Sequence, residues 1–261
     1  MNPSKLIRYI ILGSLAALIA TYLLPNHRPP RNQHGPRDYA DIAREGILAV
    51  TTEYNSLDFH VEGDTVDGMN YRLINQFAAD HGLKAEITPL MSFEERLEGL
   101  LKGRFDIIAC DIPTTSELKD SLLFSTPILL NRQVLVQRMP QDPADTTYIK
   151  SQIDLAHKTI HLVKGSPTLQ RINHLSNEIG DTIYVLEIEK YGPEQLIAMV
   201  AHGDINYTVC EENLARAVAD SLPGIDISTA ISFNQFYAWA MSKHAPALRD
   251  SVNLWLKKHL K

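Results

Sequence analysis

The chain has 261 residues, of which 44% are hydrophobic and 21% are charged, and its formal net charge is −6. This length and apolar content suffice for one large domain or two ordinary ones and exclude a largely disordered chain. A nucleic-acid binder usually carries lysine and arginine on one basic face, and no such stripe is present here. We therefore expect a folded protein that does not bind nucleic acid.

The N-terminal segment 1–24 predicts a membrane anchor. Lys5 and Arg8 precede an apolar run from Tyr9 to Leu24, which is short for a spanning helix of about 20 residues and long for a signal-peptide core of about 7–15. No clean small-x-small cleavage site precedes Pro25. We therefore expect an uncleaved anchor, with the rest of the chain exported to the periplasmic side of a bacterial cell envelope. A cleaved signal peptide, which would leave a soluble periplasmic protein, is the alternative.

A polar, proline-rich segment at residues 25–43 predicts a tether after the anchor. Beyond it, short apolar runs typical of buried strands alternate with stretches of helical period. Residues 53–67 are predicted to be irregular. Strands are predicted at 47–51, 85–88, 105–109, 133–137, 159–163, 183–186, 207–209 and 236–241. Helices are predicted at 71–81, 92–103, 193–203, 212–221 and 246–260, and another after 165–167. This alternation predicts an α/β fold with mainly parallel sheets.

Two segments set 100 residues apart, Leu100–Asp111 and Val200–Glu211, repeat one pattern. Each contains a helix end, a glycine that ends the helix, a short apolar strand, a cysteine and then an acid. Ligands in open α/β sheets lie beyond the carboxyl ends of strands. The repeat therefore predicts that Asp111 and Glu211 face each other across a cleft between two similar lobes.

The two cysteines, Cys110 and Cys210, occupy equivalent places in this repeat. A disulfide between them would cross the cleft and lock it, so free, buried thiols are the favoured expectation. The histidines show no ligand spacing better than His157 and His161, and we expect no metal and no cofactor. Motifs of serine hydrolases, phosphate-binding loops and zinc proteases are absent, so no catalytic residue is assigned.

Three motifs resemble those of the periplasmic solute-binding proteins of the amino-acid-binding type. Asp67–Tyr71 is similar to the entry to that family's first helix, Gly103–Asp106 to its G-x-x-D strand and Phe124–Pro127 to its F-S-x-P turn. The likeness covers about residues 45–243. It implies the type II periplasmic-binding-protein fold, in which two α/β lobes are joined by a two-strand hinge and the chain crosses to the second lobe and returns.

The resemblance places lobe 1 at residues 44–136 and 228–261, and lobe 2 at 137–227. Pro193–Val209 and Gln133–Arg138 also resemble segments of the non-catalytic N-terminal module of membrane-bound lytic murein transglycosylase F. The catalytic domain of such an enzyme normally contains a Glu-Ser pair, and no Glu-Ser dipeptide occurs in this chain. The resemblance thus implies a binding module and no enzyme activity.

The resemblance also implies ligand contacts. Amino-acid binders of the family grip the ligand carboxylate with an arginine and a threonine, and Leu118 and Pro113 stand at those positions here, which argues against an ordinary α-amino-acid ligand. Glu211 matches the acid that pairs with a ligand ammonium. Capping and loop packing are the alternative roles for the other candidates. These are Tyr54, Phe59, Asp111, Thr114, Thr115, Gly165, Ser166 and Thr168.

These features predict a membrane-anchored extracytoplasmic module that closes on a small polar ligand, amino-acid-like or a cell-wall peptide, for sensing, regulation or transport. The alternative is a regulatory, non-catalytic part of a peptidoglycan lytic transglycosylase system. The expected partners are the small-molecule or short-peptide ligand, the inner membrane, and a permease or a peptidoglycan-cleaving enzyme. A ligand-free scaffold is a third hypothesis, which a cleft filled by its own side chains would favour.

Overall fold

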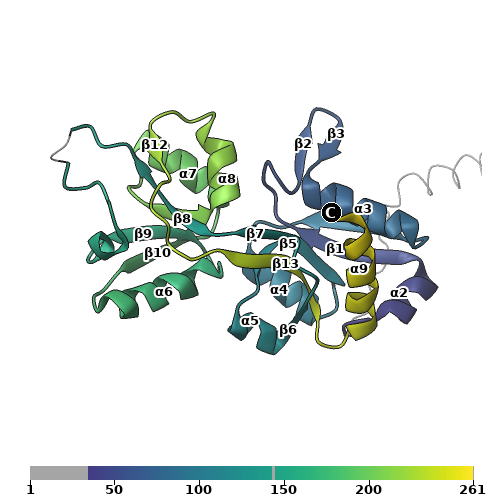
Figure 1. Cartoon of the computed structure of the whole chain (residues 1–261). Helices are drawn as coiled ribbons and strands as arrows, with labels where there is room; N and C mark the ends of the chain where they lie inside the picture. Colours follow the sequence, from purple (N-terminus) through teal and green to yellow (C-terminus); the bar gives the residue numbers. More distant parts are fainter. Residues whose placement is uncertain (1–34, 143–144, 261) are drawn as a thin grey trace, which may run out of the picture. The chain divides into compact units, whose positions relative to one another are not determined.

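The computed structural model describes residues 35–142 and 145–260, which form two mixed β-sheets flanked by helices (Figure 1). The predicted anchor at 1–24 lies outside these residues, and none of the helices described is long and apolar enough to span a membrane. The α-helices of this part are α2 (Tyr39–Glu45), α3 (Met69–Asp80), α4 (Phe93–Leu101), α5 (Ser116–Ser121), α6 (Thr168–Ile179), α7 (Pro193–His202), α8 (Glu212–Ala219) and α9 (Pro246–His259). A 3₁₀ turn, η1, spans Gln152–Leu155.

The first sheet has the strand order β4-β1-β5-β13-β6, with β7 also paired to β13. Strands β4, β1 and β5 are parallel, with β4 at the edge, whereas β13 runs antiparallel to β5, β6 and β7. The strands are β1 (Ile47–Thr52), β4 (Lys84–Pro89), β5 (Ile107–Pro113), β6 (Leu122–Phe124), β7 (Leu129–Asn131) and β13 (Gln235–Ser242).

The second sheet has the order β10-β9-β11-β8-β12. Strands β10, β9 and β11 are parallel, and β8 is antiparallel to both β11 and β12. The strands are β8 (Gln133–Arg138), β9 (Thr159–Val163), β10 (Tyr184–Ile188), β11 (Thr208–Glu211) and β12 (Ile225–Asp226). The prediction of mainly parallel sheets is therefore corrected to mixed sheets. Strands β8 and β13 lie where the chain passes between the sheets, and each enters its sheet without a crossover helix, so it runs antiparallel.

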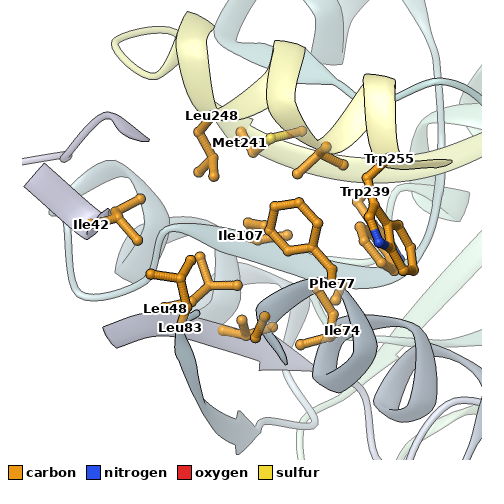
Figure 2. Packing of buried hydrophobic residues seen from close by; sticks show 14 of the residues in the cluster. Ile42, Leu48, Ile74, Phe77, Leu83, Ile107, Trp239, Met241, Leu248 and Trp255 are labelled. Carbon is orange, nitrogen blue, oxygen red and sulfur yellow. The ribbon is translucent and has the colours of Figure 1, made fainter. Parts of the chain in front are cut away.

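The strand residues alternate between two cores in the first sheet. Ile107 and Ala109 of β5 face α2, α3 and α9, whereas Ile108 and Cys110 face α4. Figure 2 shows the larger of these cores, in which Phe77 of α3 packs among residues from both sheet and helices. Burial on both faces explains why the four β5 residues Ile107–Cys110 are all apolar.

The second sheet is covered in the same way. Leu135 of β8 and Val209 of β11 pack with α6, whereas Val134 and Cys210 on the same strands pack with α7 and α8. Figure 1 shows α6 on one face of this sheet and α7 and α8 on the other. The two cysteines of the repeat thus take equivalent positions in the two sheets. Cys110 of β5 packs against α4, and Cys210 of β11 packs against α7 and α8.

Several segments differ from the sequence prediction, and two of them are a helix and a hairpin in regions that were predicted to lack regular structure. Residues 39–45, part of which falls in the predicted tether, form α2, which begins after Asp38 and ends at Gly46 in the left-handed conformation. The segment predicted to be irregular contains a hairpin of β2 (His60–Glu62) and β3 (Thr65–Asp67). Both are short and partly exposed, so they lack the hydrophobic periodicity on which the prediction rested.

Helix α4 begins as predicted, because the Ser92 hydroxyl accepts a hydrogen bond from the Glu95 N–H at 3.3 Å. Ser92→Ala is expected to lower the free energy of unfolding by about 1 kcal/mol, since one N–H loses its acceptor. Urea denaturation checks this, with Ser92→Asp as the matched control because aspartate retains an acceptor. An equal loss in both variants would contradict a capping role.

Candidate functional site

The carboxyl ends of strands from both sheets meet at one cavity. Glu53 follows β1, Asp111 lies near the end of β5, and Glu211 ends β11. All three line a space of about 50 Å³, which we call the inner cavity. A fourth carboxyl, that of Asp58, lies beside the other three around a smaller void of about 20 Å³. The predicted convergence of Asp111 and Glu211 is thus part of a larger acidic group, the acid cluster Glu53, Asp58, Asp111 and Glu211.

Amide side chains hold Asp58 in place. Its oxygens accept hydrogen bonds from Asn55 Nδ2 at 2.9 Å and from Asn70 Nδ2 at 2.6 Å, and only 4% of the residue is exposed. Asn70 is fixed in turn because its Oδ1 accepts from the buried indole N–H of Trp239 at 2.6 Å. The first sheet's core therefore determines where this carboxyl stands.

Burial and mutual repulsion raise the pKa of three of these acids. Burial, reinforced by the charge of Asp111, raises the pKa of Asp58 to about 8. Burial and the charge of Glu211 raise the pKa of Asp111 to about 6, although a hydrogen bond from Asn213 opposes the change. Burial and the charge of Glu53 raise the pKa of Glu211 to about 7. The cluster therefore holds protons near neutral pH. A cation that approaches it would stabilise the ionised carboxylates.

One cation, the guanidinium of Arg96 on α4, is among the groups that line the inner cavity. Its Nη2 donates to Glu53 Oε1 at 2.9 Å, and its Nη1 donates to the carbonyl oxygens of Leu90 and Met91. The residue is 3% exposed. Arg96 therefore neutralises part of the acid cluster from within the protein.

Direct hydrogen bonds join the two sides of the cavity. Asn213 Nδ2 of α8 donates to Asp111 Oδ2 at 3.2 Å, and Asn131 Nδ2 of β7 donates to Asn213 Oδ1 at 2.6 Å. At the far side, the backbone N–H of Ser56 donates to Glu194 Oε1 at 2.9 Å. These contacts close the cleft over the acid cluster.

A second space of about 300 Å³, the outer cavity, adjoins the inner one at Pro113 and Pro167, which line both. It lies between the segment that starts α5 and the N-terminal end of α6. Gln133 lines it, and the Oε1 atom of this 1% exposed residue has no hydrogen-bond partner among the described residues. A volume of this size falls within the range of small-molecule sites, whereas the inner cavity holds only a few water molecules.

The predicted polar contacts divide between the two cavities. Ser166 and Thr168 line the inner cavity, whereas Thr114 and Thr115 line the outer one. Several of these groups also have structural partners. The Thr115 hydroxyl caps α5, the Thr114 hydroxyl donates to Phe236 O at 3.2 Å, and the Thr168 hydroxyl accepts from Gln133 Nε2 at 3.0 Å.

The remaining predicted residues line neither cavity. Gly165 donates its N–H to Glu187 Oε1 at 2.8 Å. Phe59 is buried, with its ring centroid 6.2 Å from that of Tyr54 and 5.7 Å from that of Tyr71. Tyr54 is 39% exposed. An aromatic contact between Tyr54 or Phe59 and a ligand stays a prediction.

The cysteines confirm the favoured expectation, since Cys110 and Cys210 are both free and buried. Both line the inner cavity, and burial raises the pKa of each thiol well above its ordinary value. In the part of the chain that the structure describes, no three histidine, cysteine or acidic side chains are arranged to hold a metal ion.

Sequence reasoning missed five residues of the site: Glu53, Asp58, Arg96, Gln133 and Asn213. Glu53 carried a usable signal, because it follows a buried strand just as Asp111 does. Arg96 carried another, because it stands three residues after Phe93 and four before Leu100, on the apolar face of a helix. The other three carried no local signal.

Comparison with known proteins identifies a family that this chain matches. The model of the bacterial extracellular solute-binding proteins, family 3, matches residues 47–261. Curated relatives include membrane-bound lytic murein transglycosylase F of Desulfosudis oleivorans, 29% identical over 81% of this chain and 45% of the relative. The protein of the same name from Aeromonas salmonicida is 28% identical over 77% of this chain and 39% of its own. The chain thus spans less than half the length of these relatives.

Solved structures share the fold. Holo ArgBP from T. maritima superimposes with a TM-score of 0.72 at 23% identity, covering 85% of this chain and 94% of that one. The substrate-binding protein AbpA from Streptococcus pneumoniae, bound to L-arginine, gives a TM-score of 0.70 at 23% identity, covering 84% and 92%. These similarities establish a periplasmic-binding-protein-like α/β fold.

Proposed function

Because this chain belongs to the bacterial extracellular solute-binding proteins of family 3, we propose that its cleft closes on a small ligand that carries a positive charge. The matched region is a solute-binding domain and not an enzyme fold. The ligand class that fits is a basic amino acid or a short cell-wall peptide with a free amine. The proposed contacts are Asp111 and Glu211 for the cationic group.

The acid cluster is the observation that carries this proposal. Four carboxyl groups from both sheets share one region, while a single guanidinium, that of Arg96, lines the inner cavity. Placing like charges together in a buried site is unfavourable unless a partner of opposite charge offsets them. A cationic ligand supplies that partner, and its differential interaction with the closed state would favour closure.

The outer cavity supports a second subsite, for an anionic or acceptor group. The N-terminal end of the 12-residue helix α6 faces it, and the positive end of a helix dipole attracts carboxylates. The N–H groups of Thr168, Leu169 and Gln170 already have acceptors in this first turn, so the dipole supplies the attraction. Thr114 and Thr115 add hydroxyl groups at the opposite wall. The site would therefore take a zwitterion, with its cation toward Glu211 and its carboxylate toward α6, despite the absence of the family's usual arginine.

The proposed motion is opening and closing of two lobes, one built on each sheet, about the chain crossings before β8 and before β13, which act as a hinge. Hydrogen bonds between Asn213 and Asp111 and between Ser56 and Glu194 would break on opening. Such hinge closure around a ligand is a recurrent switching mechanism. A protein of this kind can act as a sensor that signals the presence of the ligand. In transport, it delivers the ligand to a permease.

The relatives favour a second candidate function. Membrane-bound lytic murein transglycosylases F match most of this chain over less than half of their own length. We infer that the chain could serve as the regulatory, non-catalytic part of a peptidoglycan-cleaving system, held at the periplasmic side of the inner membrane by residues 1–24. Co-purification of a transglycosylase with the full chain would support this role, and co-purification of a permease would favour transport.

Ligand binding is tested by the thermal stability of the purified full-length chain. We expect arginine, lysine or a diamino-acid cell-wall peptide to raise Tm by about 5 °C at one hundred times Kd, because binding to the folded state adds about 2.7 kcal/mol. Leucine and glutamate are the matched neutral and acidic ligands and should produce no shift. Equal shifts with leucine, glutamate and arginine would contradict a cation-selective site.

A further inference from the structure

Arg96 stands where an apolar residue would be expected. It lies on the face of α4 that includes Phe93 and Leu100, both of which pack against β5 in the core. Charged side chains are rarely buried to this degree unless they have partners. The reason for an arginine at this helix position therefore lies in the cavity that it lines rather than in the packing of the helix.

Only some of the N–H donors of the Arg96 guanidinium have hydrogen-bond acceptors among the described residues. Nη1 and Nη2 have acceptors at Leu90, Met91 and Glu53, whereas Nε is buried and has no partner among the described residues. An unpaired buried N–H lowers stability. A residue selected only to stabilise the fold would not be expected to leave this group unpaired in a polar cavity.

The space that Arg96 takes up is the inner part of the binding cleft. With the side chain in place, the inner cavity measures about 50 Å³, whereas the outer cavity measures about 300 Å³. The carboxyl of Glu53 binds the guanidinium on one side, and Asp111 and Glu211 line the same cavity. Arg96 thus presents to the acid cluster the chemical group that a basic ligand would present.

We propose that Arg96 is an intramolecular ligand: its guanidinium binds Glu53 at the wall of the inner cavity, reduces the free space there, and thereby determines how deeply an external ligand can enter the cleft. External ligands then use the outer cavity and reach the acid cluster only through Asp111 and Glu211. Arg96 is in this sense a specificity-determining residue. The inference rests on the proposed function only in assuming that the same cleft binds ligand.

Chemical rescue tests this directly. In the full-length chain, Arg96→Ala vacates the guanidinium site, and ethylguanidinium, agmatine or arginine at millimolar concentration should refill it. We expect a rise in Tm of about 3 °C or more for the variant at ten times Kd, and less than about 1 °C with ethylguanidinium for the wild type, whose site is already filled. Sodium chloride and tetramethylammonium at equal ionic strength are the control additives.

Arg104→Ala is the matched control variant. Arg104 is an exposed arginine just beyond the same helix, where its guanidinium lies 4.8 Å from the ring centroid of Phe105. Its removal deletes the same atoms outside the cleft and should create no response to ethylguanidinium. The double variant Glu53→Gln, Arg96→Ala should lose the response, because the carboxylate that binds the guanidinium is gone.

Arg96→Gln provides a second background if Arg96→Ala does not fold, since it keeps more of the side chain's packing volume while removing the guanidinium. The same selective stabilisation by ethylguanidinium is expected there. Equal stabilisation of wild type, Arg104→Ala and the Arg96 variants, or none in a folded Arg96 variant, would overturn the proposal. Because ethylguanidinium mimics the side chain itself, rescue can succeed even where the wild type binds no amino acid, which separates this result from a failure of the proposed function.

Discussion

Glu211→Gln is expected to raise the free energy of unfolding by on the order of 2–3 kcal/mol at pH 8 and by much less at pH 5, while weakening arginine binding at least tenfold. The pKa of Glu211 rises from 4.5 to about 7 in the folded protein, first through burial and then through the charge of Glu53. Each pKa unit corresponds to about 1.4 kcal/mol. Glutamine removes this ionisation cost, and its amide can donate to Oε1 of the neighbouring Gln133, which has no hydrogen-bond partner among the described residues.

The sign of the pH dependence follows from proton linkage. Between the unfolded and folded pKa values, the folded state binds more protons than the unfolded state, so stability falls as pH rises. The contribution of Glu211 is fully present below about pH 4.5 and is lost as pH passes through about 7. Urea denaturation of wild type and variant at pH 5, 6, 7 and 8 should show the two curves diverging with increasing pH.

Glu212→Gln is the matched control, one residue away. The Glu212 carboxylate accepts hydrogen bonds from Arg132, at 2.7 Å and 3.0 Å, and these hold the pKa of Glu212 below its ordinary value. Its stabilising effect is therefore present above the unfolded pKa and lost as pH falls. Glu212→Gln should destabilise by about 1 kcal/mol, equally at pH 6 and pH 8. A stabilising effect of Glu211→Gln that does not grow with pH would contradict the assignment.

Asp106→Ala is expected to lower the free energy of unfolding by about 3–5 kcal/mol, the largest effect on stability that we anticipate. The Asp106 side chain is fully buried and forms an ion pair with Arg37. Its Oδ2 accepts from the Ala49 N–H at 2.7 Å, and its Oδ1 accepts from Arg37 Nε at 3.1 Å. Removal leaves a mostly buried guanidinium and a backbone N–H of β1 without this acceptor.

Two further variants test this assignment by urea denaturation. Asp106→Asn retains an acceptor for the Ala49 N–H but loses the charge, so its cost should be intermediate, about 1.5–3 kcal/mol. Asp41→Ala removes the exposed ion pair with Arg44 and should change stability by less than about 0.5 kcal/mol. Similar effects of Asp106→Ala and Asp41→Ala would show that the buried ion pair does not hold this end of the first sheet.

The sequence predicted strands best where a short, largely apolar run is bounded by turn residues. Strand β9 has the predicted bounds, Thr159–Val163, because an apolar run between turn residues is distinctive. The β2–β3 hairpin was missed because its pairs, such as His60 with Asp67, are short and partly exposed. The direction of β8 and β13 could not be predicted from local pattern, since it depends on how the chain crosses between the sheets.

The site was predictable only where a strand end identified it. Asp111 and Glu211 were found through the repeat, and Glu53 obeys the same rule without a repeat partner. Asp58 had no such signal, because its position depends on Asn70 and the indole of Trp239 far along the chain. Local periodicity treats an arginine among apolar residues as an interruption, and so it missed Arg96.

The two free thiols allow the rate of cleft opening to be measured without an introduced probe. Cys110 and Cys210 are each 2% exposed, and burial keeps both in the protonated, unreactive form while the cleft is shut. Alkylation requires the thiolate and access to it, so its rate measures how often the inner cavity meets solvent. Mass spectrometry resolves the two cysteines separately and follows opening on each wall without an introduced label.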